Sequence, residues 1–200
     1  MNYLDMKQAV KLLANEWNLG KKECGAKGDI CAWIYLFSFL AESEKIVIHK
    51  EGKILIGLGG YSKNNSKRHL LRKKFYTIIK KQLYKSKDIK DLNALMQYDS
   101  NYSYLPNELG NHFDGELSLL IVNKNHRGKN IGKKMLLEIF SLASKDGLKN
   151  LMILTDESCN FKFYESCGCK KVYETIVKNQ EYGKLGKIST EKAYIYEKGL

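Results

Sequence analysis

The chain has 200 residues, a formal net charge of +12 and a hydrophobic content of 44%. This length suits one domain, and the hydrophobic content excludes a disordered chain. The most apolar run, residues 30–41, is shorter than the roughly twenty residues that a membrane-spanning helix needs, and the start of the chain lacks the order of a signal peptide. We therefore expect a cytoplasmic protein without a membrane partner.

The five cysteines indicate neither a disulfide framework nor a metal site. They are Cys24, Cys31, Cys159, Cys167 and Cys169. An odd count without a secretory signal favours reduced thiols. Cys167 and Cys169 lack a second Cys or His pair at ligand spacing, so we expect no metal.

The first elements predicted along the chain are two helices and a hairpin. Apolar residues at helical spacing predict helices over 4–17 and 30–41. Two runs rich in β-branched residues, 45–49 and 53–58, flank a turn that contains Gly52 and predict a β-hairpin.

A strongly basic segment follows the hairpin. Residues 63–90 hold eleven Lys or Arg and one acidic residue, Asp88. Apolar residues recur at every fourth position and predict a helix with one apolar stripe, made of Leu71, Phe75, Ile79 and Leu83. Residues 98–115 are typical of a loop. We interpret 62–112 as an insertion, or arm, in a single domain that spans 1–200.

The second half of the chain alternates strands and helices before two final strands. Strands are predicted at 116–122, 151–155, 171–177 and 192–197, and helices at 131–145 and 158–167. Gly147 and Gly168 end the two helices. This order predicts a mixed α/β layer structure.

The most informative segment is VNKNHRGKNIGK, from Val122 to Lys133, where a strand leads through a polar loop into a helix. The first amides of a helix lack internal partners and carry partial positive charge, which suits a phosphate or pyrophosphate. Gly128 and Gly132 allow close backbone approach, and nearby lysines add positive charge. The segment matches neither the nucleotide-triphosphate loop nor the dinucleotide-binding pattern.

Residues 127–132, read as RGKNIG, resemble the Q/R-x-x-G-x-G/A motif of the GNAT superfamily of N-acetyltransferases. In that family the loop holds the pyrophosphate of CoA through backbone amides. Asn130 departs from the motif, because it stands where the family has its first glycine. Asn tolerates left-handed backbone geometry well, so we expect the loop to keep its shape at some cost in CoA affinity.

A second segment supports the same resemblance. Residues 160–169, NFKFYESCGC, are similar to the family's N-x-x-x-x-Y/F-Y-x-x-x-G-F region, with Cys169 in place of the usual Phe. The resemblance covers 45–61 and 116–177. It implies a central mixed, mostly antiparallel twisted sheet flanked by helices, and an acetyl-CoA-binding core over 116–177.

The resemblance assigns the two catalytic roles to Glu116 and Tyr164. Glu116 would remove a proton from the acceptor amine, often through water in this family, and Tyr164 would give a proton to the departing CoA thiolate. The strand from Glu116 to Val122 is on the order of 20 Å long, similar to the reach of the pantetheine arm. His112 and Asp114 are alternative bases. Period two places Glu116, Ser118 and Leu120 on one face.

Further residues are expected to bind acetyl-CoA. Leu120 and Val122 would do so through backbone groups left free by a bulge, and Asn160 would hydrogen-bond the pantetheine arm. The remaining candidates belong to the phosphate loop, and they are Arg127, Gly128, Lys129, Asn130, Ile131, Gly132 and Lys133. Cys159 and Cys167 lack a local His and are expected to be incidental thiols.

We therefore expect transfer of the acetyl group of acetyl-CoA to a primary amine, directly and in a ternary complex. The acceptor, a small molecule or a peptide, stays open. The alternative is a catalytically silent CoA-fold binding module whose basic arm binds RNA or an acidic partner. A third interpretation is that the arm covers the acceptor site and sets substrate choice.

Overall fold

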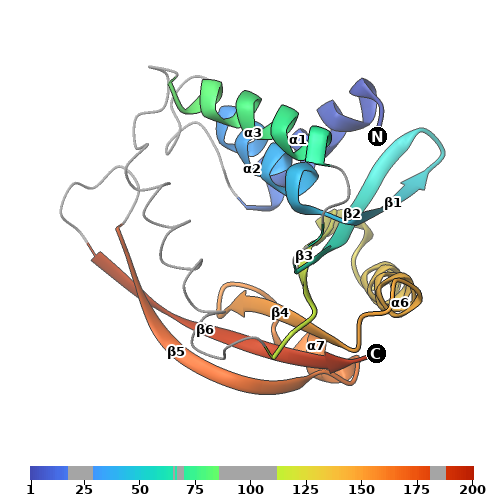
Figure 1. The fold of residues 1–200 in the computed structure, drawn as a ribbon, viewed down its shortest axis with the longest axis vertical. Helices are drawn as coiled ribbons and strands as arrows, with labels where there is room; N and C mark the ends of the chain where they lie inside the picture. The colour runs from blue at the N-terminus through green and yellow to red at the C-terminus, as the bar shows by residue number, and fades with distance from the viewer. Residues whose placement is uncertain (18–28, 65, 67–69, 86–111, 181–187) are drawn as a thin grey trace.

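The computed structural model describes residues 1–17, 29–64, 66, 70–85, 112–180 and 188–200 (Figure 1). Within these residues, six strands form one sheet in the order β1-β2-β3-β4-β6-β5. Every neighbouring pair is antiparallel except β3 and β4, which are parallel. The predicted mixed, mostly antiparallel sheet flanked by helices is confirmed.

The observed elements follow the predicted order. The strands are β1 (Lys45–Glu51), β2 (Ile54–Lys63), β3 (Gly115–Val122), β4 (Asn150–Asp156), β5 (Lys170–Gln180) and β6 (Ile188–Gly199). The helices are α1 (Tyr3–Glu16), α2 (Asp29–Glu42), α3 (Leu70–Tyr84), the short 3-10 turn η2 (Lys124–His126), α6 (Ile131–Lys145) and α7 (Lys162–Ser166). None of these described helices is long and apolar enough to cross a membrane.

The helices cover β1, β2 and β3 from both faces. Helices α1, α2 and α3 gather at one end of the molecule, while β5 and β6 form the opposite end (Figure 1). One buried cluster joins α1 and α2 to Leu58, Leu119 and Ile121. A second joins α6 to Leu117 and to β4 and β6. The sheet thus has an α2 face and an α6 face.

Helix α6 has the bounds that its sequence predicts. Its apolar stripe of Ile131, Met135, Leu136, Ile139, Phe140 and Ala143 is buried. The helix ends before Gly147, whose φ of +83° favours glycine. It packs so close to β2 that a Cβ added at Gly57 would lie 2.5 Å from Sδ of Met135.

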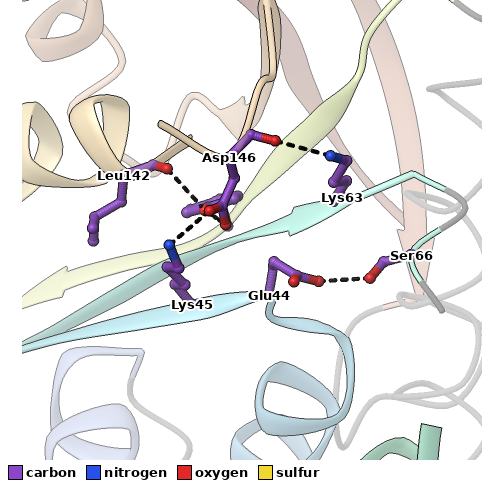
Figure 2. A network of polar contacts seen from close by, with 7 residues as sticks. Glu44, Lys45, Lys63, Ser66, Leu142 and Asp146 are labelled. Atoms are coloured by element: carbon purple, nitrogen blue, oxygen red, sulfur yellow. Dashed lines mark hydrogen bonds and ion pairs between the residues drawn. The ribbon is translucent and has the colours of Figure 1, made fainter. Parts of the chain in front are cut away.

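A polar network ties the end of α6 to the β1–β2 hairpin (Figure 2). The fully buried Tyr61 donates its hydroxyl to Asp146 Oδ2 at 2.5 Å, and the Leu142 carbonyl lies 3.1 Å away. Lys45 Nζ contacts Asp146 Oδ1 at 2.7 Å, and Lys63 Nζ donates to the Asp146 carbonyl at 3.0 Å. The two ammonium groups lie at the negative end of the helix dipole, where cations are stabilising.

A β-bulge in β3 changes which of its side chains share a face. Gly60 pairs with Leu119 and Tyr61 pairs with Leu117, so Ser118 is an extra residue in β3. Leu120 and Val122 pack against the α6 face, whereas Ser118 Oγ lies 3.5 Å from Ser43 Oγ, at the end of α2. The expectation that Glu116, Ser118 and Leu120 share a face is therefore wrong, because one extra residue reverses the alternation.

Strands β3 and β4 separate soon after they meet. Their parallel register contains only the pairs Gly115↔Leu151 and Glu116↔Met152. Beyond these positions β4 continues to pair with β6, and β3 continues to pair with β2. The sheet consequently opens between β3 and β4 toward the end of β3.

Two helix predictions need correction. The helix expected over 158–167 is shorter, because Asp156 Oδ1 accepts hydrogen bonds from the amide and the hydroxyl of Ser158 and fixes a turn. On α3 the packed residues are Tyr76, Ile79 and Leu83, whereas Phe75 is 58% exposed. The ring of Tyr76 stacks on Phe37 of α2 at 5.5 Å and turns the helix away from the expected stripe.

The cysteines differ from expectation at one described position. Cys31 of α2 is disulfide-bonded, so the expectation of reduced thiols is wrong there. Cys159, Cys167 and Cys169 are free thiols, as expected. Cys24 and the part of the predicted arm at 86–111 lie outside the described residues.

Candidate active site

The junction between β3 and α6 has the geometry of an anion site. Asn130 has φ 58° and ψ 13°, in the left-handed region, and provides no side-chain cap to the helix. Lys134 N donates to the Asn130 carbonyl at 3.0 Å, and the amides of residues 131–133 have no hydrogen bond within the described structure. These amides and the helix dipole favour a bound phosphate group. Asn130 therefore keeps the loop geometry, as expected.

Positively charged side chains surround this junction. One of those predicted to bind a ligand, Arg127, is instead engaged by other residues of the protein. Lys129, Lys133 and Lys134 are exposed and form no ion pair in the described part of the chain. Arg127 is instead held by the protein: Nε donates to the Val122 carbonyl at 3.3 Å, and the guanidinium pairs with Glu16 of α1. We therefore infer that Arg127 shapes the loop rather than supplying charge to a ligand.

Glu16 is a residue of this site that the sequence did not predict. Its side chain is 4% exposed, and its Oε1 accepts the Lys124 amide at 2.9 Å. It therefore holds both the start and the end of η2. The separation of more than one hundred residues between Glu16 and Arg127 explains why no local pattern indicates the contact.

Beyond Glu116, the edge of β3 that faces the opening of the sheet pairs with no other strand among the residues that the structure describes. Asn123 N donates to the Ile56 carbonyl of β2 at 2.9 Å. Backbone groups alternate in direction along a strand, so those of Leu120 and Val122 point away from β2 and toward the opening. The backbone groups of Leu120 and the amide of Val122 thus face the opening, while the Val122 carbonyl accepts the hydrogen bond from Arg127 Nε. The register shift that accompanies these residues lies at Ser118.

Helix α7 lies beside the start of α6. A Cβ added at Gly132 would lie 3.6 Å from the Phe163 ring and 3.8 Å from Val122. The Phe163 ring lies 5.4 Å from the ring of Tyr164, measured between centroids. The end of β3, the start of α6 and α7 therefore converge.

Tyr164 is half-buried, and its hydroxyl has no hydrogen bond in the described structure. Burial, together with the nearby Cys159, Cys169 and Asp156, raises the pKa of Tyr164 above its usual value of 10. The hydroxyl therefore stays protonated near neutral pH and can donate a hydrogen bond. Asn160 has an exposed side chain, and its carbonyl accepts the Phe163 amide at 3.0 Å.

Glu116 lies at the beginning of β3, where β3 and β4 still pair. Its side chain is partly buried and forms no hydrogen bond with another described residue. Burial and the negative charge of Glu42 raise the pKa of Glu116 to about 7. A carboxyl group with this pKa can take up and release a proton near neutral pH.

The two alternative bases have other partners. Asp114 Oδ2 accepts the amides of Lys149 and Asn150 at 2.6 and 3.1 Å, and these bonds lower the pKa of Asp114. His112 Nε2 contacts Glu197 at 3.0 Å. Asp114 therefore holds the start of β4, and His112 is engaged with Glu197. Because both residues already have partners, the geometry favours Glu116 as the base.

Cys159 and Cys169, which lie before and after α7, are poor nucleophiles. Burial is the largest cause of the raised pKa of Cys159, and burial also raises the pKa of Cys169 to about 11. A raised pKa reduces the fraction of thiolate, the form that nucleophilic attack requires.

The described residues contain no group of three or more potential metal ligands.

A model of the GNAT family of acetyltransferases matches residues 94–169. No curated protein matches the sequence. The match includes β3, the phosphate loop, α6, β4 and α7.

Solved structures resemble the whole chain at low identity. PH1933 from Pyrococcus horikoshii OT3 has a TM-score of 0.60 at 15% identity, with 100% of this chain and 94% of that chain covered. An N-acetyltransferase from Staphylococcus aureus Mu50 has a TM-score of 0.56 at 13% identity, with 100% and 94% covered. The yncA protein of Salmonella typhimurium, solved with its cofactor acetyl-CoA, has a TM-score of 0.53 at 11% identity, with 100% and 90% covered. These likenesses show a shared fold.

Proposed function

We propose that this chain, a member of the GNAT superfamily, transfers the acetyl group of acetyl-CoA to a primary amine in a ternary complex. The observation that carries the proposal is the β3–α6 junction: open helix amides lie beside an edge of β3 that pairs with no other described strand. The pyrophosphate of acetyl-CoA would bind the helix amides, and its amide-containing arm would bind the strand edge. The family match over residues 94–169 includes both features.

The donor side of the proposed site lies on the α6 face. The amides of residues 131–133 would bind the pyrophosphate, with Lys129 and Lys133 adding positive charge. The backbone of Leu120 and Val122 would pair with the arm along the open edge, and Asn160 would donate a side-chain hydrogen bond to it.

The acceptor side lies on the α2 face, at Glu116. An amine is protonated at neutral pH and attacks a carbonyl only after it loses a proton. Glu116, in its ionised form, accepts that proton directly or through one water. The amine nitrogen then bonds to the acetyl carbon and loses a second proton to water, and the bond from that carbon to sulfur breaks. The opening between β3 and β4 lets the two reactants meet from opposite faces of the sheet.

Tyr164 assists the departure of the sulfur. A thiol has a pKa of about 8.5, well below the raised pKa of Tyr164, so complete proton transfer from the phenol is unfavourable. We therefore assign Tyr164 a hydrogen bond to the developing thiolate, which stabilises charge in the transition state. Solvent supplies the final proton.

The direct test is acetyl-CoA-dependent release of CoA with a panel of primary amines. We expect turnover by the wild type, a drop of about 100-fold or more in kcat for Glu116→Gln, and a smaller drop for Tyr164→Phe. The matched control is Glu157→Gln, an exposed glutamate outside the site. Equal activity of Glu116→Gln and wild type would remove Glu116 from the mechanism.

A further inference from the structure

The last residue of α1, Glu16, contacts the loop that leads from β3 to α6. Its side chain is 4% exposed. Its Oε2 pairs with the guanidinium of Arg127, and its Oε1 accepts the Lys124 amide at 2.9 Å. Lys124 is the first residue of η2 and Arg127 directly follows η2. The two oxygens of one carboxylate therefore hold this turn at both of its ends.

Without these two contacts the position of Glu16 would be unfavourable. A buried carboxylate loses its hydration, and the last turn of a helix carries partial negative charge. Helix α1 has no basic residue in its last turn that could offset these costs. The compensating guanidinium and amide both come from the loop, so the carboxylate and the observed loop conformation stabilise each other.

Arg127 extends the contact to the end of β3. Its Nε donates to the Val122 carbonyl at 3.3 Å, and its amide donates to the Lys124 carbonyl at 3.3 Å. Because the donors of a guanidinium have fixed directions in one plane, the pairing with Glu16 orients the whole group. Only residues 128–130 lie between Arg127 and the first residue of α6. The position of Arg127 therefore bears directly on the geometry of the phosphate loop.

Helix α1 is itself fixed to the sheet near its start. Asp5 Oδ1 pairs with Lys50 Nζ of β1 at 2.6 Å, and Gln8 Oε1 accepts the Leu55 amide of β2 at 2.7 Å. The apolar residues of α1 between these contacts and Glu16 are buried in the cluster that includes residues of β2 and β3. A helix held in this way gives the Glu16 carboxylate a fixed position relative to the loop.

We propose that Glu16 is a positioning residue of the acetyl-CoA site. Acting through Arg127, it holds the phosphate loop in the conformation in which the amides of residues 131–133 face the pyrophosphate. The proposal rests on the proposed function and deepens it, because it extends the cofactor site to α1, outside the residues 94–169 that the family model matches. It gives Glu16 no contact with acetyl-CoA, so loss of Glu16 should lower donor affinity rather than the rate of the chemical step.

The first test is calorimetric titration of acetyl-CoA into the wild type, Glu16→Gln and Asp5→Asn. Glutamine keeps an oxygen for the Lys124 amide but removes the charge that pairs with Arg127. We expect the Kd of Glu16→Gln to rise by about tenfold or more, because the loop amides lose their alignment.

Asp5→Asn is the matched control for this titration. It also removes the charge of a buried α1 carboxylate, 9% exposed, that pairs with a basic side chain, but it does so at the opposite end of the helix. Its Kd should stay at the wild-type value. An unchanged Kd in Glu16→Gln, or an equal rise in both variants, overturns the proposal.

A double-mutant cycle tests whether Glu16 acts through Arg127. The double variant of Glu16→Gln and Arg127→Gln should bind acetyl-CoA about as weakly as Glu16→Gln alone, because both substitutions break one ion pair. Losses that multiply would show independent effects and would overturn the proposal. Arg127→Lys serves where Glu16→Gln does not fold, since it keeps a positive charge beside Glu16 but removes the planar group. Its Kd should also rise, and an unchanged Kd overturns the proposal.

Kinetics separate this role from a purely structural one. With an amine that the wild type acetylates, Glu16→Gln should raise KM for acetyl-CoA, while kcat at saturating acetyl-CoA and KM for the amine stay unchanged. A lower kcat with unchanged KM for acetyl-CoA would overturn the positioning role.

Failure of this proposal and failure of the function are distinguishable, because calorimetry needs no turnover. Weaker binding by Glu16→Gln, without acetylation of any amine by the wild type, would support the role of Glu16 and contradict the acetyltransferase function. Turnover by the wild type with an unchanged Kd in Glu16→Gln would do the reverse. Absence of acetyl-CoA binding to the folded wild type contradicts both.

Discussion

Asp114 and Glu116 lie two residues apart, and their pKa values are shifted in opposite directions. Two backbone amides donate to Asp114 and lower its pKa, whereas burial and the charge of Glu42 raise the pKa of Glu116 to about 7. Hydrogen bonds stabilise an ionised carboxylate, while desolvation and a like charge favour the neutral form. Neighbouring acids thus acquire a structural role and a proposed chemical role from their surroundings.

The titration of Glu116 predicts the pH dependence of the reaction. Glu116 must be ionised to accept a proton, so kcat/KM should rise with pH through an apparent pKa of about 7. Glu42→Gln removes the like charge and should move this rise to lower pH, because ionisation of Glu116 becomes easier. Initial rates from pH 5 to 9 measure both profiles, and Glu157→Gln should leave the profile unchanged. A Glu42→Gln profile displaced to higher pH would contradict the assignment.

At the scale of elements, the start of α6 depends on a residue that is not glycine. Asn130 adopts a left-handed conformation, which Asn tolerates better than most side chains and β-branched residues tolerate poorly. The family motif has glycine at this position, and the change preserves the backbone geometry. The helix amides consequently remain directed outward.

Substitutions at Asn130 should change stability and acetyl-CoA affinity together. Asn130→Val should lower the free energy of unfolding by about 1–2 kcal/mol and weaken acetyl-CoA binding, because the left-handed conformation becomes strained. Asn130→Gly should preserve or tighten binding. Urea unfolding and acetyl-CoA titration measure the two effects. Unchanged affinity in a folded Asn130→Val variant would show that this backbone geometry does not hold the ligand.

The opposite end of α6 depends on the network around Asp146. Tyr61→Phe removes a buried hydroxyl that reaches both Asp146 and the Leu142 carbonyl. We expect a loss of about 1–2 kcal/mol in the free energy of unfolding, with acetyl-CoA affinity unchanged. Tyr3→Phe is the control, because Tyr3 is 66% exposed. Equal stability of Tyr61→Phe and wild type would mean that the network does not stabilise the helix end.

At the scale of the whole molecule, periodicity and turn residues predict most elements well. Residues 131–145 form a helix with the predicted bounds, since its buried stripe, polar start and Gly147 all agree. The loop motif also predicts the open junction. Local pattern therefore suffices where one element determines its own geometry.

The remaining features depend on contacts between distant segments. The Ser118 bulge arises from pairing with β2, and it reverses the face of Leu120. The ion pair of Arg127 with Glu16 joins the phosphate loop to α1, and the charge of Glu42 on α2 raises the pKa of Glu116 on β3. In both cases the two residues lie far apart in the chain. A pattern read along one segment contains no information about such partners.

The most direct test of the acetyl-CoA site is calorimetric titration of acetyl-CoA into the wild type, Gly132→Ala and Gly132→Trp. A Cβ at Gly132 makes ordinary contact with Phe163 and Val122, so Gly132→Ala should still bind, whereas the Trp ring would fill the space between α6, α7 and β3. We predict micromolar-range binding to the first two proteins and none to the third. Absence of binding to the folded wild type, or equal binding to all three, would contradict the proposed site.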